Sequence, residues 1–110
     1  MASFANATVY FEVDKSSLTS KSIQTLKSAV DALNENSTIE VTLSGHADER
    51  GTREYNLALG QRRAESVSDY LVLNGINKSR ITVKSFGEEK PLAYGQDEAS
   101  YAKNRRVEIN

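Results

Sequence analysis

The sequence predicts an α+β domain in which helices pack on a β-sheet, with elements in the order β-α-β-α-β-α-β. Three observations predict this class. Four short segments alternate between apolar and polar residues, as strands do, and two longer segments between them repeat apolar residues at helical spacing. The chain has 110 residues, a usual size for one domain. It has no repeat and no Pro- or Gly-rich linker, so we expect residues 1–110 to form a single domain.

The first half of the chain is predicted to form a strand, a helix and a second strand. The first strand is predicted over residues 8–13, where apolar and polar residues alternate. The helix is predicted over residues 19–35, with Thr19 as a favoured N-cap, and the second strand around residues 39–44. The apolar positions on which these assignments rest are Val9, Phe11 and Val13, then Ile23, Leu26, Val30 and Leu33, then Ile39, Val41 and Leu43.

The second half is predicted to form a long helix, a strand, a short helix and a final strand. Thr52 is the predicted N-cap of the long helix. Gly75 is its predicted C′ residue, since glycine tolerates the left-handed backbone that ends many helices. Alternating residues predict strands around residues 81–83 and over residues 105–109, with a short helix over residues 98–103 between them.

The composition excludes several classes of function. With 14 basic and 15 acidic residues the formal net charge is −1, which gives no overall field to hold a nucleic acid. The absence of Cys excludes disulfides, thiolate metal sites and a Cys nucleophile. No stretch approaches the ~18 apolar residues of a membrane span. The first residues do not resemble a signal peptide, and we expect residues 1–7 to be disordered or to derive from cloning.

The most unusual segment is a polar loop bounded by Gly45 and Gly51. It places His46 and Asp48 at the carboxyl end of a strand, where ligands commonly bind in sheets with helical crossovers. From the pattern alone, a solvated turn is an equally good interpretation. A metal site would need a second His, which the chain lacks. A hydrolase would pair Ser44 with His46 and Asp48, but neighbours this close in sequence rarely converge as a triad.

A second group of candidate residues lies on the long helix. Asn56, Leu59 and Arg63 fall at positions i, i+3 and i+7, so they share one stripe of the helix. Arg63 is either a surface arginine whose stem covers apolar area or a fork that accepts a carboxylate with two hydrogen bonds. In the second case, Arg63 and Asp48 could hold a ligand that carries both a carboxylate and an ammonium group.

A third cluster, residues 103–106, brings three basic residues and an asparagine to the start of the last strand. It is either a small basic patch or part of an exposed sheet edge, where the charged side chains prevent pairing with a strand of another molecule.

Separated motifs then occur in a fixed order along the chain. They are Gly45-His46-Ala47-Asp48-Glu49-Arg50-Gly51-Thr52, Glu54-Tyr55-Asn56, Leu59-Gly60, Arg62-Arg63-Ala64 and Asn104-Arg105-Arg106-Val107. Together they resemble the OmpA-like peptidoglycan-binding domain, and the resemblance extends over residues 9–109. The first motif is most like the family members of the Tol–Pal system. The resemblance implies a mixed four-stranded sheet with two long helices packed on it.

The resemblance also implies a binding site for the peptide stem of peptidoglycan, centred on its diaminopimelate residue. Asp48 matches the loop acid that meets the amino group of the ligand, and Arg63 matches the helix arginine that meets a diaminopimelate carboxylate. The other matching positions are Asn56 and Leu59 in the same site, His46 as a supporting loop residue, Asp14 at the end of the first strand, and Val13, where the family commonly has an aromatic residue. Arg105 and Arg106 match a characteristic pair; Arg105 is taken as a candidate, although the sequence does not decide which of the two faces the ligand.

In function, the resemblance implies a binding protein without enzymatic activity, cofactor or metal. Its implied partners are peptidoglycan and a TolB-like periplasmic propeller protein, with no nucleic acid. The implied location is the periplasmic face of the outer membrane, held by a lipid anchor outside this chain, where the protein tethers that membrane to the cell wall in envelope integrity and cell division. The alternatives are the same domain of a porin or a flagellar stator protein, and a peptidoglycan hydrolase that uses His46 and Asp48.

Overall fold

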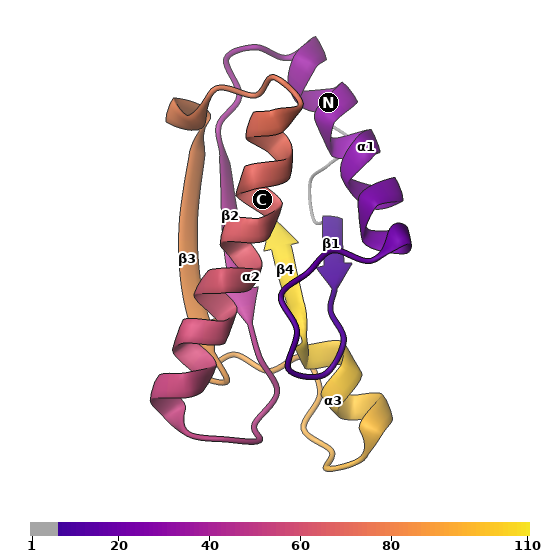
Figure 1. The fold of residues 1–110 in the computed structure, drawn as a ribbon, viewed down its shortest axis with the longest axis vertical. Helices are drawn as coiled ribbons and strands as arrows, with labels where there is room; N and C mark the ends of the chain where they lie inside the picture. Colours follow the sequence, from indigo (N-terminus) through magenta and orange to yellow (C-terminus); the bar gives the residue numbers. More distant parts are fainter. Residues whose placement is uncertain (1–6) are drawn as a thin grey trace.

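A four-stranded sheet with both long helices on one of its faces forms the fold, as the computed structural model of residues 7–110 shows (Figure 1). The predicted α+β class and element order are confirmed, with a short 3-10 helix in addition. In chain order the elements are β1 (Ala7–Tyr10), α1 (Ser20–Glu35), β2 (Val41–His46), α2 (Arg53–Leu73), η1 (Lys78–Arg80), β3 (Ile81–Gly87), α3 (Glu98–Asn104) and β4 (Arg106–Ile109).

The sheet is mixed, as the resemblance implied. Its strand order is β1-β4-β2-β3, with β4 antiparallel to both β1 and β2, and β2 parallel to β3. The last strand of the chain therefore lies between the first two, and β2 lies beside it near the centre of the sheet. The carboxyl end of β2, the β1–α1 loop and the first half of α2 all reach the same end of the molecule, in the lower half of Figure 1.

Strand residues alternate between the helix-covered face of the sheet and the opposite face. The apolar core lies under the helices and includes Leu43 of β2 with Val107 and Ile109 of β4. The alternate positions of β4, Arg106 and Glu108, point to the other face, which is polar. No helix of residues 7–110 combines the length and the apolar composition that a membrane crossing requires.

The helix ends follow the predicted local signals. Thr19 and Thr52 are the N-caps of α1 and α2, and their hydroxyl oxygens accept hydrogen bonds from the backbone N–H groups of Ser22 and Tyr55. Gly75 has a φ of 95°, and its N–H donates to the carbonyl of Val72, which closes the C-terminus of α2 in the way that the sequence predicted.

The strand boundaries differ from the prediction in several places. β2 begins at Val41, two residues later than predicted, and β3 extends to Gly87, beyond the residues that predicted it. β1 ends at Tyr10 because the chain turns away from the sheet after the buried Phe11, and the next residues form a loop instead of the predicted strand to residue 13. β2 extends to His46, into the predicted loop, and β4 begins one residue later than predicted, at Arg106. Of residues 1–7, expected to lie outside the fold, Ala7 is the first residue of β1 and the others fall outside the described residues.

Two glycines bring α2 close to the end of β2. A Cβ on Gly45 would overlap the backbone carbonyl of Gly60, and a Cβ on Gly60 would overlap the Ser85 hydroxyl. Because neither glycine carries a side chain, the backbone of α2 lies directly on the sheet at this level. This close approach fixes the first half of α2, which carries Asn56 and Arg63, beside the loop that carries Asp48.

Candidate functional site

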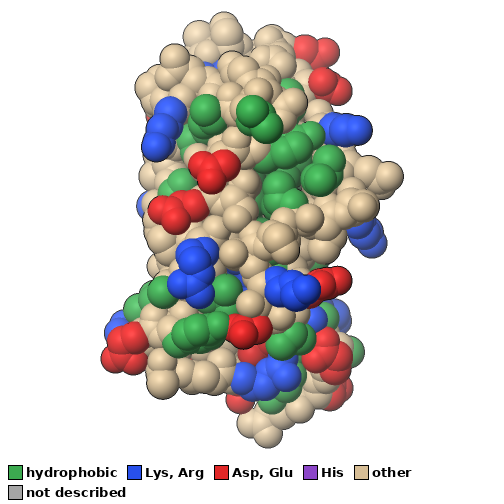
Figure 2. Space-filling view, in the orientation of Figure 1, with side chains coloured by type: hydrophobic (Ala, Val, Ile, Leu, Met, Phe, Trp, Pro, Cys, Tyr) green, Lys and Arg blue, Asp and Glu red, His purple; other side chains and the backbone are tan. Residues whose placement is uncertain are grey.

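A cleft of about 320 Å³ lies between the β1–α1 loop, the β2–α2 loop and the first three turns of α2. Its volume is at the lower end of the range of ligand sites, roughly 300–1,000 Å³. In the view of Figure 2, acidic, basic and apolar side chains lie close together on this half of the surface. The cleft is lined by Val13, Asp14, Ala47, Asp48, Arg50, Gly51, Tyr55, Asn56, Leu59 and Arg63.

Six of the eight predicted site residues line this cleft. They come from segments as far apart in sequence as Val13 and Arg63, which the fold brings together. His46 and Arg105 are the two that do not line it. The cleft also contains Arg50 and Tyr55, which the sequence analysis did not select as site residues.

Asp48 is a buried acid whose carboxylate is already paired. The Arg50 side chain donates to both carboxylate oxygens, from Nε at 3.1 Å and from Nη2 at 2.9 Å, and the backbone N–H of Arg50 donates at 3.1 Å. Nη1 of Arg105 lies 3.6 Å from Oδ2. Burial alone would raise the pKa of Asp48, but the hydrogen bonds and charges of these arginines outweigh it and hold the pKa below its usual value. Asp48 is therefore ionised at neutral pH.

Asp14 is the second acid of the cleft, in the loop after β1. It has a φ of 59°, the only positive φ of a non-glycine residue among residues 7–110. Its carboxylate accepts a hydrogen bond from the phenol of Tyr55, in the first turn of α2. This contact joins the β1–α1 loop to the first turn of α2. It explains why Tyr55 belongs to the site, although the sequence analysis did not select Tyr55 as a site residue.

Arg63 is fully buried at the base of the cleft, so the interpretation as a surface arginine is wrong. Its guanidinium donates to three backbone carbonyls, those of Glu12 (3.1 Å), Lys15 (2.8 Å) and His46 (3.0 Å). A guanidinium has five N–H donors, so two of the Arg63 N–H groups take no part in these three hydrogen bonds. Burial, followed by the charge of Arg105, lowers the pKa of Arg63 to about 10, which leaves it a cation at neutral pH.

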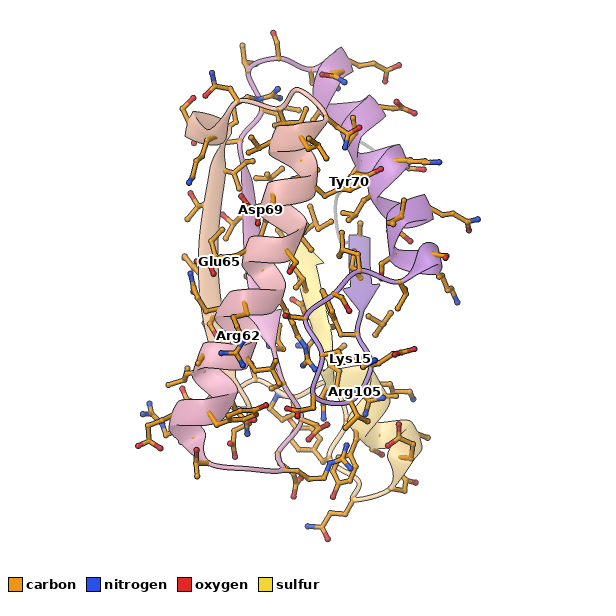
Figure 3. The ribbon with its side chains drawn as sticks, viewed as in Figure 1. Lys15, Arg62, Glu65, Asp69, Tyr70 and Arg105 are labelled. Carbon is orange, nitrogen blue, oxygen red and sulfur yellow. The ribbon has the colours of Figure 1, made fainter. Side chains whose placement is uncertain are left out.

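The neighbouring arginine on α2 has a different environment. Arg62 is exposed and its guanidinium lies 5.9 Å from the centre of the Tyr55 ring. Figure 3 shows it on the outer side of α2, across from Lys15 in the β1–α1 loop and Arg105 at the end of α3. Consecutive residues of a helix are rotated by about 100° around its axis, which separates the two arginines in this way.

Asn56 and Leu59 form the helical wall of the cleft, on the stripe that the sequence predicted. Both are buried. The Asn56 amide donates to Oε1 of Glu88 at 2.7 Å, which ties the first turn of α2 to the loop after β3. Leu59 gives the wall its apolar part, and the exposed Val13 stands on the opposite side, in the β1–α1 loop.

His46 contributes its backbone to the site, and its side chain lies elsewhere. It is the last residue of β2, and its carbonyl accepts the hydrogen bond from Arg63 described above. Its ring is buried and stacked on Phe86, with 5.5 Å between ring centres and 22° between ring planes. Neither ring nitrogen has a hydrogen-bond partner among residues 7–110. No hydrogen bond or ion pair joins the ring to Asp48 among the described residues, so the pairing that a His46–Asp48 hydrolase would use is not formed.

The structure separates the two arginines of the C-terminal pair. Arg105 lies behind the cleft, where its Nε donates to the carbonyl of Phe11 at 2.9 Å and its Nη1 approaches Asp48. Arg106 points to the opposite face of the sheet, where it pairs with Glu108 at 2.7 Å. Arg105 is thus the member of the pair beside the cleft, and it approaches Asp48 without lining the cleft itself. Residues 7–110 contain no group of three His, Asp or Glu side chains arranged to hold a metal ion.

Comparisons with known proteins identify relatives of this chain. The model of the OmpA family matches residues 10–105. The chain is 49% identical over 105 residues to the peptidoglycan-associated lipoprotein of Pseudomonas putida, which covers 96% of this chain and 63% of that protein. It spans about three fifths of the length of these curated relatives, the peptidoglycan-associated lipoproteins of Pseudomonas putida, Pseudomonas aeruginosa and Legionella pneumophila.

Solved structures give the same result. The crystal structure of the peptidoglycan-associated lipoprotein from Burkholderia pseudomallei matches with a TM-score of 0.90 and 42% identity, over 93% of this chain and 86% of that one. The OmpA-like domain of FopA1 from Francisella tularensis matches with a TM-score of 0.81 and 29% identity, over 93% of this chain and 68% of that one.

The substitution Arg63→Ala is expected to lower the free energy of unfolding by about 3 kcal/mol or more, because it leaves three backbone carbonyls without their charged donor. Urea unfolding followed by circular dichroism measures the loss. Arg62→Ala, on the same helix but exposed, is the matched control and should change the free energy by less than about 0.5 kcal/mol. Equal effects of the two substitutions would contradict this role of Arg63.

His46 is expected to make the fold less stable in mild acid. Burial, then the charge of Arg106, lowers its pKa from 6.5 to about 4, so the unfolded chain binds a proton more readily than the folded one. The stability that this gives is complete above pH 6.5 and is lost as the pH falls towards 4, by about 3 kcal/mol at most.

Because His46 is the only histidine, its pKa can be read from the imidazole proton signals in a nuclear magnetic resonance (NMR) titration. The variant His46→Gln should show a weaker loss of unfolding free energy between pH 6.5 and 4. Parallel pH profiles of the two proteins, or a pKa near 6.5, would refute the assignment.

Proposed function

This chain belongs to the OmpA family, and we propose that its cleft binds the peptide stem of peptidoglycan without covalent chemistry. The observation that carries the proposal is the arrangement of charge in the cleft. Two carboxylates, those of Asp14 and Asp48, and the guanidinium of Arg63 line one cavity of about 320 Å³. A ligand that fits this arrangement carries an ammonium and a carboxylate group a few ångströms apart.

The diaminopimelate residue of the stem has this chemistry. Its side chain ends in an amine and a carboxylate, so the ammonium would pair with Asp48 and the carboxylate with the two remaining N–H groups of Arg63. The N-terminus of α2, which borders the cleft at Gly51 and Tyr55, adds a favourable potential for the carboxylate. A stem with lysine in this position lacks the carboxylate and would leave Arg63 with unpaired donors, which favours diaminopimelate.

For the whole protein we propose a lipoprotein that tethers the outer membrane to the cell wall within a Tol–Pal-type system, on the periplasmic side. The support is the name that the most similar relatives carry and the higher identity to them, 49% and 42%, than to the OmpA-like domain of FopA1, 29%. We propose a binding role without catalysis, because His46 and Asp48 do not meet and the charged side chains of the cleft are engaged in hydrogen bonds.

The wall-binding proposal is tested by pull-down with purified sacculi. Asp48→Asn removes the charge that would meet the ligand's ammonium and should reduce the bound fraction at least tenfold, while circular dichroism shows an intact fold. Asp69→Asn, an exposed acid farther along α2, is the matched control and should bind like the unchanged protein. Full retention of Asp48→Asn on the sacculi would reject the site. Mass spectrometry of muropeptides after incubation should find them uncleaved.

We further propose that a TolB-like periplasmic propeller protein docks over the same cleft, as the family resemblance implies. A shared surface makes the two ligands compete, so the stem peptide should weaken the apparent affinity for the propeller protein in a titration. Simultaneous and independent binding of both ligands would reject the overlap and leave the wall-binding proposal standing.

A further inference from the structure

In the structure, the site's own Arg50 occupies the position that a ligand ammonium would take on Asp48. Both carboxylate oxygens of Asp48 accept hydrogen bonds from the Arg50 side chain, at 2.9 and 3.1 Å. Arg50 also lines the cleft, and its side chain is almost half exposed, so it can leave this position without disturbing the core. A cation that binds to Asp48 must therefore compete with Arg50.

Arg50 also contacts a second group of side chains, on α3. Its Nη2 lies 3.8 Å from Oε1 of Glu98, and its guanidinium lies 4.2 Å from the centre of the Tyr101 ring, both on α3. Glu98 is itself held by Arg105, whose Nη2 donates to it at 2.8 Å. Acids and arginines thus alternate around a ring of four side chains, in the order Asp48, Arg50, Glu98 and Arg105.

Asp48 does not depend on the Arg50 side chain for its own position. The backbone N–H of Arg50 donates to Oδ1 at 3.1 Å, and Arg105 stands 3.6 Å from Oδ2. Both contacts remain when the Arg50 side chain moves away. The carboxylate would stay oriented, with the oxygens that Arg50 leaves open to another donor.

We infer that Arg50 is an internal competitor for the ammonium group of the ligand: it covers Asp48 in the free protein, and when the ligand binds it gives up Asp48 and moves fully onto Glu98 and Tyr101, which it already contacts. This inference rests on the proposed function and deepens it. It assigns to Arg50 a role in selectivity, because only a ligand that brings its own cation can replace the one that Asp48 loses. A neutral ligand group that displaced Arg50 would bring no positive charge, so the Asp48 carboxylate would lose the cation that Arg50 had provided.

Calorimetric titration with the stem tripeptide L-Ala-γ-D-Glu-meso-diaminopimelate tests the inference, because removal of Arg50 should raise the affinity for the tripeptide and not lower it. Arg50→Gln removes the competitor, so the tripeptide should bind about two- to fivefold more tightly, the range that a partly exposed ion pair is worth. Arg53→Gln is the matched control, since it removes an equal charge from an exposed ion pair with Glu89 near the start of α2. It should change the affinity by much less than Arg50→Gln.

A double-mutant cycle separates this role from a general structural one. Glu98→Gln removes the acid that would hold the Arg50 guanidinium once it has left Asp48. In the protein that keeps Arg50, this substitution should therefore weaken binding of the tripeptide. In the Arg50→Gln background the same substitution should have almost no effect, because no guanidinium is left to transfer. A tripeptide acetylated on the side-chain amine of diaminopimelate should gain nothing from Arg50→Gln.

The outcomes distinguish this inference from the function on which it rests. Weaker or unchanged binding by Arg50→Gln, together with lost binding by Asp48→Asn, would overturn the role of Arg50 and leave peptidoglycan binding intact. Unchanged binding by Asp48→Asn would overturn both. Equal effects of Glu98→Gln in the two backgrounds would also overturn the transfer of Arg50.

Discussion

The geometry of the cleft depends on one buried guanidinium, that of Arg63. Its three hydrogen bonds end on carbonyls of two segments that are not adjacent in sequence, the loop after β1 and the end of β2. A single planar group on α2 therefore sets the distance between the loop that carries Asp14 and the loop that carries Asp48. Few other side chains could donate to three carbonyls at once, so the buried guanidinium stabilises this arrangement of the two loops.

The sequence predicted those parts of the structure that local physical chemistry determines. Thr19 and Thr52 were recognisable as caps because a hydroxyl oxygen satisfies the free N–H groups of a helix start, and Gly75 because it accepts a positive φ. The common stripe of Asn56, Leu59 and Arg63 also follows from helical spacing alone. The mixed sheet and the identity of the ligand as a peptidoglycan stem came from the resemblance, not from these patterns.

The features that the sequence missed depend on tertiary contacts. Alternation shows that Arg105 and Arg106 point to opposite faces, but only the packing of the helices decides which face is covered. In the same way His46 looks like a loop residue beside Asp48, yet pairing of β2 with β3 extends the strand and turns the ring away from the cleft. The contact of Arg50 with Glu98 joins residues 48 positions apart in sequence, and no short-range pattern reports it.

The charges of the cleft are balanced before any ligand arrives, and this has a consequence for affinity. Asp48 is paired with Arg50 and Arg105, and three of the N–H groups of Arg63 already donate to carbonyls, so most charged groups of the cleft have partners within the protein. A ligand gains only the difference between its contacts and those that it replaces, which favours modest affinity at a single site. Modest affinity at each single site is sufficient for the proposed tether. A wall presents many identical stems, and attachment to a membrane keeps the domain near them, so the effective concentration provides the strength that one cleft lacks.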